Sequence, residues 1–204
     1  MKLYDHPVAP NPRRVRVFLA EKGITVPTET IDLLKGEHRT PEFLALDPLG
    51  RVPLLVLDNG RCLAESVSIC RYFEALHPTP CLFGEGAEEQ AFVDMWQRRV
   101  ELELFFPIAH AVRHGIAMFQ ALEPVQLPQW AELSAARANE AMIWLDKTLA
   151  ERPFIAGENF SVADITAMCA FDFSLAVGGP KLPENLSNLR RWRDQVSARP
   201  SAAA

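Results

Sequence analysis

Two predicted helix starts in the first third of the chain carry polar side chains that could do chemistry. Ser66 follows Glu65 at one start, and Asn11 precedes Pro12 at the other. The first N–H groups of a helix have no partner within it, and the helix dipole places partial positive charge there. Such an end can hold a carboxylate or stabilise another anion, such as a thiolate. Both residues are also good N-caps, so the residue types alone leave a purely structural role open.

These residues must be positioned by alternating strands and helices. Strand patterns cover residues 1–5, 26–31, 52–57 and 62–64, and helical patterns begin near residues 11, 40 and 66. The order is strand, helix, strand, short helix, strand, hairpin strand, helix. It predicts a mixed four-stranded sheet with helices on both faces, and the thioredoxin-like fold fits this order best.

The second half of the chain shows only helical patterns. We expect a first domain over residues 1–77, a linker rich in Pro and Gly over 78–86, and an all-helical domain over 87–204. Helices are predicted over 87–122, 129–151, 161–177 and 186–198. Pro107 should kink or break the first of them, because proline lacks an N–H group.

The composition excludes several classes of protein. The 204 residues carry a formal net charge of −5, which disfavours nonspecific binding to nucleic acid or anionic membranes. The most apolar stretch, residues 165–177, contains Asp172 and is too short to span a bilayer. The four cysteines form neither CxxC nor a metal-ligand spacing, so we expect reduced thiols, no metal and no dithiol chemistry. Since the N-terminus lacks a signal-peptide pattern, we expect a cytoplasmic protein.

Several stretches, taken together, resemble the glutathione transferase family. Residues 50–55 (GRVPLL) resemble its G-[KRQ]-[VI]-P-x-L segment, and residues 63–69 (LAESVSI) resemble its [LI]-x-E-S-x-A-I element. Residues 154–164 (FIAGENFSVAD) resemble its [FY]-[LI]-x-G-x-x-[FP]-[ST]-x-A-D motif, and residues 189–201 resemble its last helix. One of these stretches would be weak evidence, but all of them in order and at family spacing are strong.

The resemblance implies where glutathione binds. A cis peptide bond before Pro53 would expose the backbone of Val52 to the cysteinyl part of glutathione, and a cis bond costs little before proline. Glu65 and Ser66 would hold the γ-glutamyl end, whose carboxylate suits a helix start.

Basic side chains are candidates for the glycine carboxylate of glutathione. Arg51 and His38 fall near positions that contribute in many relatives, and Lys35 is a weaker candidate. Each of the three could equally be a solvated loop residue.

The thiol-activating position departs from the common family pattern. Ala9 stands where theta- and zeta-like relatives carry serine, and Pro10 stands where beta-like relatives carry cysteine. Tyr4 lies inside the first strand and should be packed. Asn11 therefore becomes the candidate catalytic residue, as in nu-like and related bacterial groups whose asparagine contacts the glutathione sulfur.

Two further sets of residues have different predicted roles, one structural and one in binding the second substrate. Ser161 and Asp164 form a capping box, so Asp164 should tie a helix start to the preceding loop and do no chemistry. Phe106, His110 and Arg113 on the long helix could face the second substrate, with apolar neighbours such as Phe105, although a wet helix face is the plainer explanation.

The expected function is an enzyme that activates the glutathione thiolate. It would add glutathione to an electrophile, or use it to reduce a disulfide or a peroxide. The alternative is a glutathione-binding regulatory or carrier protein of the same fold with little catalysis. The resemblance also implies a homodimer, and the electrophilic substrate cannot be identified from the sequence.

Overall fold

The computed structural model describes all 204 residues, which divide into two compact units. The first unit is Met1–Pro80 with Ala203–Ala204, and the second is Cys81–Ala202. The elements of the first unit are β1 (Lys2–Asp5), α1 (Pro10–Glu21), β2 (Thr28–Thr30), a 3-10 turn (Glu37–Arg39), α2 (Pro41–Leu46), β3 (Leu54–Val56), β4 (Cys62–Ala64) and α3 (Ser66–Leu76).

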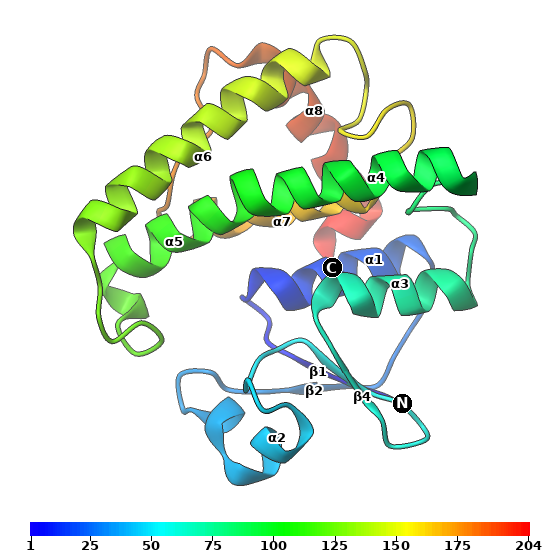
Figure 1. Ribbon diagram of the computed structural model, residues 1–204, viewed down its shortest axis with the longest axis vertical. Coiled ribbons are helices and arrows are strands. Elements are labelled where there is room, and N and C mark those ends of the chain that lie inside the picture. Colours follow the sequence, from blue (N-terminus) through cyan, green and yellow to red (C-terminus); the bar gives the residue numbers. More distant parts are fainter. The chain divides into compact units, whose positions relative to one another are not determined.

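The first unit contains the predicted mixed four-stranded sheet. Its strand order is β2-β1-β3-β4, with β1 and β2 parallel and the other two pairs antiparallel. Figure 1 shows α1 and α3 on one face of the sheet and α2 on the other. The predicted thioredoxin-like architecture is therefore confirmed for this unit.

Alternation along the strands separates the two faces of the sheet. Leu3 of β1 and Leu55 of β3 are buried with Val15 and Phe18 of α1, because residues directly opposite each other on paired strands point to the same face of the sheet. Tyr4 points to the other face and meets the ring of Phe43 from α2 edge-on at a centroid distance of 5.6 Å. Tyr4 is thus a packing residue, as its place in the strand predicts.

The second unit is helical. Its elements are α4 (Gly86–Val100), a π-helical turn (Glu101–Phe105), α5 (Phe106–Gly115), a 3-10 turn (Ala117–Phe119), α6 (Pro128–Leu149), α7 (Val162–Val177), α8 (Ser187–Ser197) and a final 3-10 turn (Pro200–Ala203). Pro107 does not break the long helix. It stands in the first turn of α5 directly after the π-helical turn, where the missing N–H group is tolerated.

The central helix of this unit is α7, which is buried along most of its length. Asp164 is fully buried and accepts hydrogen bonds from the Ile155 N–H (2.9 Å), the Ser161 N–H (2.9 Å), the Ser161 hydroxyl (3.1 Å) and the Trp192 indole (2.8 Å). Burial raises the pKa of the Asp164 carboxyl, and these four donors oppose the rise. The predicted capping box is confirmed, and Asp164 joins α7, the preceding loop and α8.

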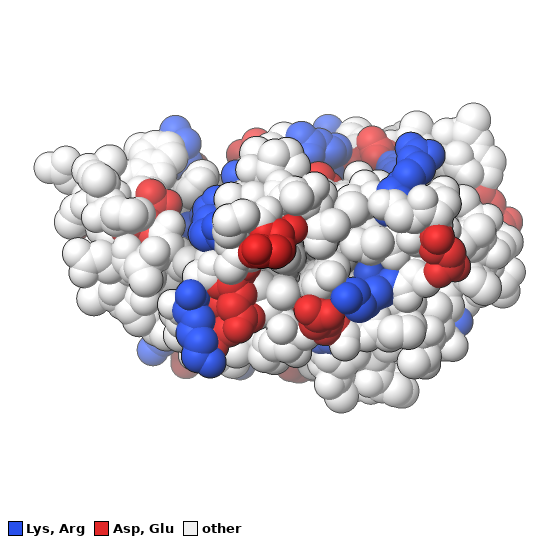
Figure 2. Space-filling view, turned by 90° about the horizontal axis from the view of Figure 1, so that it is seen from below, with Lys and Arg blue, Asp and Glu red and all other residues white.

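No helix is both long and apolar enough to cross a membrane. Basic and acidic side chains are interspersed on the face drawn in Figure 2, and neither sign gathers into a patch there. An anionic ligand on this face would therefore depend on local groups, as the net charge of −5 also suggests.

Candidate functional site

The sheet register gathers the predicted glutathione residues of the first unit at one edge. β1 runs antiparallel to β3 with Tyr4 opposite Leu54, and Leu54 lies opposite Ala64 of β4. Asp5 at the end of β1 lies beside Thr30 at the end of parallel β2. The segments that follow β1, β2 and β4 therefore meet the segment that precedes β3. These segments carry Asn11, His38, Glu65, Ser66 and residues 51–53.

The start of α3 leaves backbone N–H groups that could bind an anion. Glu65 is the N-cap, and its φ of 66° and ψ of 117° make it the one non-glycine residue with positive φ. Such a conformation costs about 1–3 kcal/mol and concentrates at functional sites. The first helical bond runs from the Ile69 N–H to the Glu65 carbonyl (3.0 Å), so the amides of Ser66 and Val67 have no acceptor within the helix.

The Ser66 hydroxyl does not cap α3, contrary to one of the two roles considered from the sequence. Ser66 is the first helical residue, and the helix has no side-chain cap bond. Its buried hydroxyl instead accepts a hydrogen bond from the Arg14 guanidinium at 2.8 Å. This bond occupies a lone pair and leaves the hydroxyl hydrogen available to an acceptor outside the helix.

Arg14 is the site residue that sequence reasoning missed. It lies on α1, is fully buried, and brings a positive charge to the start of α3. One sequence signal could have found it, because Arg14 stands four residues before Phe18 and therefore shares the core-facing side of α1.

The segment before β3 presents free backbone. The Val52–Pro53 peptide bond is cis, as predicted. Val52 lies outside the paired residues of β3, and its N–H and C=O take no part in the backbone hydrogen bonds of the sheet. The Arg51 side chain is exposed, and the Arg51 N–H donates to the buried Asp47 carboxylate at 2.9 Å, which holds the segment in place.

Gly50 brings His38 next to this segment. The φ of Gly50 is +58°, and a Cβ atom there would lie 2.5 Å from the His38 carbonyl oxygen, so only glycine fits. His38 is buried, and its Nδ1 has no hydrogen-bond partner. Burial, with a smaller effect from Arg39, lowers the pKa of His38. His38 is therefore neutral at pH 7 and could offer a hydrogen bond rather than a charge. Lys35, the weaker candidate, pairs with Asp32 at 3.1 Å.

Asn11 is in the first turn of α1 but does not cap it. The helix begins two residues earlier than predicted, at Pro10, with Ala9 as N-cap and no side-chain cap bond. The first amide that bonds back is that of Arg13, which donates to the Ala9 carbonyl at 3.2 Å. Pro10 and Pro12 have no N–H group, so Asn11 supplies the one free backbone amide of this turn. The Asn11 side-chain amide is half-buried and also has no partner.

Arg16 fixes the loop that leads to Asn11. Its guanidinium contacts both carboxylate oxygens of Asp5 (2.7 and 2.9 Å) and the carbonyls of His6 (3.3 Å) and Pro7 (2.9 Å). The loop between β1 and α1 is therefore tied to the end of the sheet rather than left to solvent.

The predicted second-substrate residues lie in the helical unit. Phe106, His110 and Arg113 share one face of α5, and the Phe106 and His110 rings stack at 6.3 Å with an interplanar angle of 15°. His110 also contacts the ring of Trp130 from α6 at 5.7 Å. Phe106 is 41% exposed, whereas Phe105 is buried in the core and cannot line a substrate surface as expected. Burial and the neighbouring His114 and Arg113 lower the pKa of His110.

Comparison with known proteins identifies the family of this chain. Residues 8–76 match the family model described as "Glutathione S-transferase, N-terminal domain", and residues 111–200 match "Glutathione S-transferase, C-terminal domain". The chain is 39% identical to glutathione S-transferase 2 of Saccharomyces cerevisiae over 204 residues, which is 98% of this chain and 87% of that protein. The chain belongs to the glutathione S-transferase family.

Solved structures of glutathione S-transferases support the same conclusion. The crystal structure of Gtt2 from Saccharomyces cerevisiae matches with a TM-score of 0.94 and 38% identity, covering 100% of this chain and 99% of that one. A glutathione S-transferase of class Gtt2 from Vibrio parahaemolyticus matches with a TM-score of 0.85 and 34% identity, covering 98% and 95%. The expected enzyme class and two-part fold are thus confirmed, while the nu-like class stays a prediction.

Proposed function

We propose that this transferase binds glutathione at the sheet edge and activates its thiol through Asn11. The observation that carries the proposal is the pair of free donors of Asn11, which stand between two prolines at the start of α1. A thiolate accepts a stronger hydrogen bond than a thiol, so both donors favour ionisation. The partial positive charge of the helix start acts in the same direction.

The donors of Asn11 and the helix start can supply the free energy needed to lower the pKa of the glutathione thiol. A free thiol titrates near about 8.5, so only a few per cent is thiolate at neutral pH. Lowering the pKa by two units requires about 2.7 kcal/mol of preferential stabilisation. One hydrogen bond to a charged group contributes about 1.5–3 kcal/mol, so two donors and a helix end suffice.

For the second substrate we propose a flat, apolar electrophile. The thiolate sulfur would attack an electrophilic carbon, a C–S bond would form, and the leaving group would depart with its electron pair. The stacked Phe106 and His110 rings, with Trp130 beside them, form an aromatic surface that suits such a molecule. The exposed Arg113 on the same helix face would favour electron-withdrawing, partly negative substituents such as nitro groups.

Asn11→Ala is expected to raise the pKa of bound glutathione by about one unit and to slow turnover near pH 6.5 about tenfold. The affinity for glutathione should change little. Ultraviolet titration of the thiolate, together with rates for an aromatic halide and a mixed disulfide, measures this. The fold should stay intact, because the Asn11 side chain makes no cap bond.

Two further variants sharpen this experiment. Asn11→Asp should be slower still because a carboxylate repels the thiolate, and Asn185→Ala, at an exposed loop asparagine, should behave as the parent protein. A thiolate titration curve in Asn11→Ala that overlays the parent curve would remove Asn11 from the mechanism. Good turnover of the mixed disulfide with none of the halide would favour the disulfide-reducing alternative, and turnover of neither would favour a carrier.

Ser66→Ala is expected to weaken glutathione binding by about 1.5–3 kcal/mol, the loss of one donor to a charged carboxylate. Calorimetric titration measures the affinity, and thermal unfolding measures stability separately. Because Ser66 makes no cap bond, any loss of stability would come from the Arg14 guanidinium, which loses one hydrogen-bond acceptor. Ser68→Ala, at an exposed serine of the same turn, is the matched control. Unchanged affinity would leave Ser66 with a structural role alone.

We also propose a homodimer in solution, as the family resemblance implies. The exposed apolar side chains of α4 and the following turn, Phe92 (51%) and Leu102 (44%), are candidates for a partner surface. Sedimentation equilibrium at micromolar concentration should give twice the 22.8 kDa chain mass. A single species of the chain mass would contradict the proposal.

A cytoplasmic location fits the cysteine chemistry. All four cysteines are free, and Cys62 is exposed, a state that persists in a reducing compartment. Such a compartment would also keep glutathione in the thiol form that the reaction needs.

A further inference from the structure

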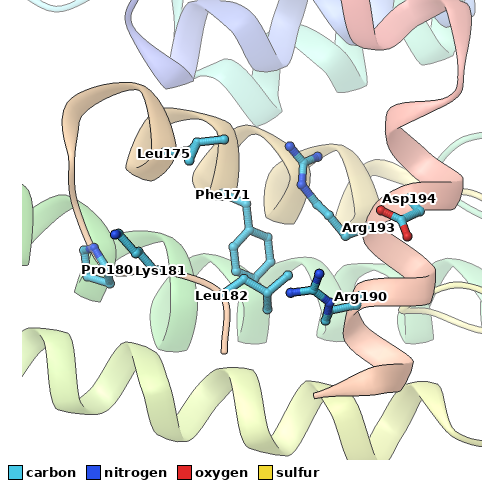
Figure 3. A pocket seen from close by; sticks show the side chains of 8 residues that line it. All are labelled: Phe171, Leu175, Pro180, Lys181, Leu182, Arg190, Arg193 and Asp194. Carbon is cyan, nitrogen blue, oxygen red and sulfur yellow. The ribbon is translucent and has the colours of Figure 1, made fainter. Parts of the chain in front are cut away.

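The aromatic surface formed by Phe106, His110 and Trp130 is not part of the pocket drawn in Figure 3. That pocket is lined by residues of α7, the loop after it and α8, and none of the three rings belongs to its lining. The aromatic surface is formed instead by two other helices, with the His110 ring of α5 5.7 Å from the Trp130 ring of α6. Its shape therefore depends on how the end of α5 and the start of α6 are held together.

The start of α6 has no side-chain cap of its own. Leu127 is the N-cap, and leucine has no acceptor to offer the first amides of the helix. Pro128 follows in the first turn and fixes only its own φ angle. The connection from α5 covers residues 116–127, which is longer than most connections between paired helices. Contacts from outside α6 must therefore place Trp130, which stands in its first turn.

Gln126 joins this helix start to the end of α5. Its side-chain Nε2 donates to the Arg113 carbonyl at 2.7 Å and to the Ile116 carbonyl at 2.8 Å. Carbonyl groups at the end of a helix lack partners within it, and one amide nitrogen carries two hydrogens, so a single side chain satisfies both. Ile116 is the C-cap of α5, and Gln126 directly precedes the N-cap of α6. One side chain thus ties the two helix ends together.

His114 makes a second connection. Its Nδ1 accepts a hydrogen bond from the Leu127 N–H at 3.3 Å, so the last turn of α5 holds the N-cap residue of α6 directly. A neutral imidazole that accepts at Nδ1 carries its proton on Nε2. His114 lies one turn after His110, and the two ring centroids are 6.4 Å apart. The same side chain therefore lies beside His110 and holds the helix that carries Trp130.

We propose that Gln126 and His114 are positioning residues for the second substrate. They fix Trp130 against His110, and the surface formed in this way selects flat aromatic groups. A flat group gains from stacking only where the rings beneath it keep their distance and angle. Without the two connections Trp130 would move away from His110, whereas the Phe106–His110 pair would remain because both residues lie within α5. The positioning role rests on the proposed function and deepens it.

The test measures how much an aryl group adds to the binding of a glutathione conjugate. S-(2,4-dinitrophenyl)glutathione carries a flat aromatic group, and S-methylglutathione has the same peptide without that group. Calorimetric titration of the full chain gives both affinities, and their ratio isolates the contribution of the aromatic surface. We expect the parent protein to prefer the aryl conjugate at least about tenfold, because an aromatic ring gains from both burial and stacking.

Side-chain variants test the positioning role. Gln126→Met keeps the length of the side chain without its donors, and His114→Phe keeps a ring without its acceptor. Each should lower the preference for the aryl conjugate about threefold, and the double variant should lower it about tenfold, the range expected for one aromatic contact. The affinity for S-methylglutathione should not change. His114→Asn, whose Oδ1 can accept in place of Nδ1, should keep most of the preference.

A matched control is Gln129→Met, at an exposed glutamine in the first turn of α6, which should bind both conjugates as the parent protein does. Circular dichroism confirms the fold of each variant. An unchanged preference in both folded single variants, or an equal loss in His114→Asn and His114→Phe, would overturn the positioning role alone. Equal binding of the two conjugates by the parent protein would contradict the proposed second-substrate surface, and binding of neither would contradict the proposed glutathione site. The positioning role would fall with either.

Discussion

Asp164→Ala is expected to lower the free energy of unfolding of the helical unit by about 4 kcal/mol. The substitution leaves the buried amides of Ile155 and Ser161 and the Trp192 indole without their acceptor. Each buried donor left unpaired costs about 1–3 kcal/mol. Asp164→Asn should cost about half as much, because the amide oxygen keeps an acceptor while its NH₂ group faces donors.

Tryptophan fluorescence during urea unfolding measures this effect in the helical unit specifically, since all four tryptophans lie between residues 96 and 192. Glu158→Ala, at an exposed residue of the same loop without a hydrogen bond, is the matched control and should be neutral. Glutathione affinity should be unchanged wherever the variant is folded. A midpoint shift as small as that of the control would show that Asp164 does not join the loop and the two helices as described.

Arg14→Met is expected to weaken glutathione binding by about 2–3 kcal/mol, or about 30- to 150-fold. The guanidinium orients the Ser66 hydroxyl at 2.8 Å and places a buried positive charge beside a helix start that would bind a carboxylate. Methionine keeps much of the volume, and replacing a buried charge by an apolar side chain can be tolerated by the fold. Arg14→Lys keeps the positive charge but loses the planar guanidinium with its several N–H donors. Its affinity for glutathione should therefore lie between those of the parent protein and Arg14→Met.

Calorimetric titrations of Arg14→Met, Ser66→Ala and the double variant form a cycle that isolates the coupling of the pair. If Arg14 acts through Ser66, the double variant should bind glutathione with about the same affinity as the single variant that has the lower affinity. Arg61→Met, at an exposed arginine of the hairpin in the same unit, controls for net charge and should bind normally. Simple additivity of the two single effects would show that Arg14 and Ser66 act independently.

Local sequence patterns predicted much of the fold. The N-cap Thr40, whose hydroxyl accepts from the Phe43 N–H at 3.3 Å, and the capping box at Ser161 depend on neighbours within a few residues. The cis bond before Pro53 is likewise part of a short motif. Such features are readable because the interacting groups are close in the chain.

The incorrect predictions concern positions where two local backbone conformations have similar energies. Asn11 and Ser66 both have good capping side chains, yet Ala9 and Glu65 are the N-caps and neither helix has a side-chain cap bond. Pro107 was expected to kink or break a helix, but it does not break the helix and stands in the first turn of α5 directly after a π-helical turn. Helix propensity alone does not show which of two neighbouring residues begins a helix, since both choices cost a similar energy.

The sequence by itself determined the order of strands and helices, the family motifs and the residues available to bind an anion at two helix starts. Only the tertiary structure decided which partners those residues take. Arg14 of α1 and Ser66 of α3 are 52 positions apart, and Arg193 of α8 forms an ion pair with Asp172 of α7. These pairings depend on how α1 packs on α3 and how α7 packs on α8. Packing of that kind is set by side-chain shape across many distant residues, and no short stretch of sequence contains it.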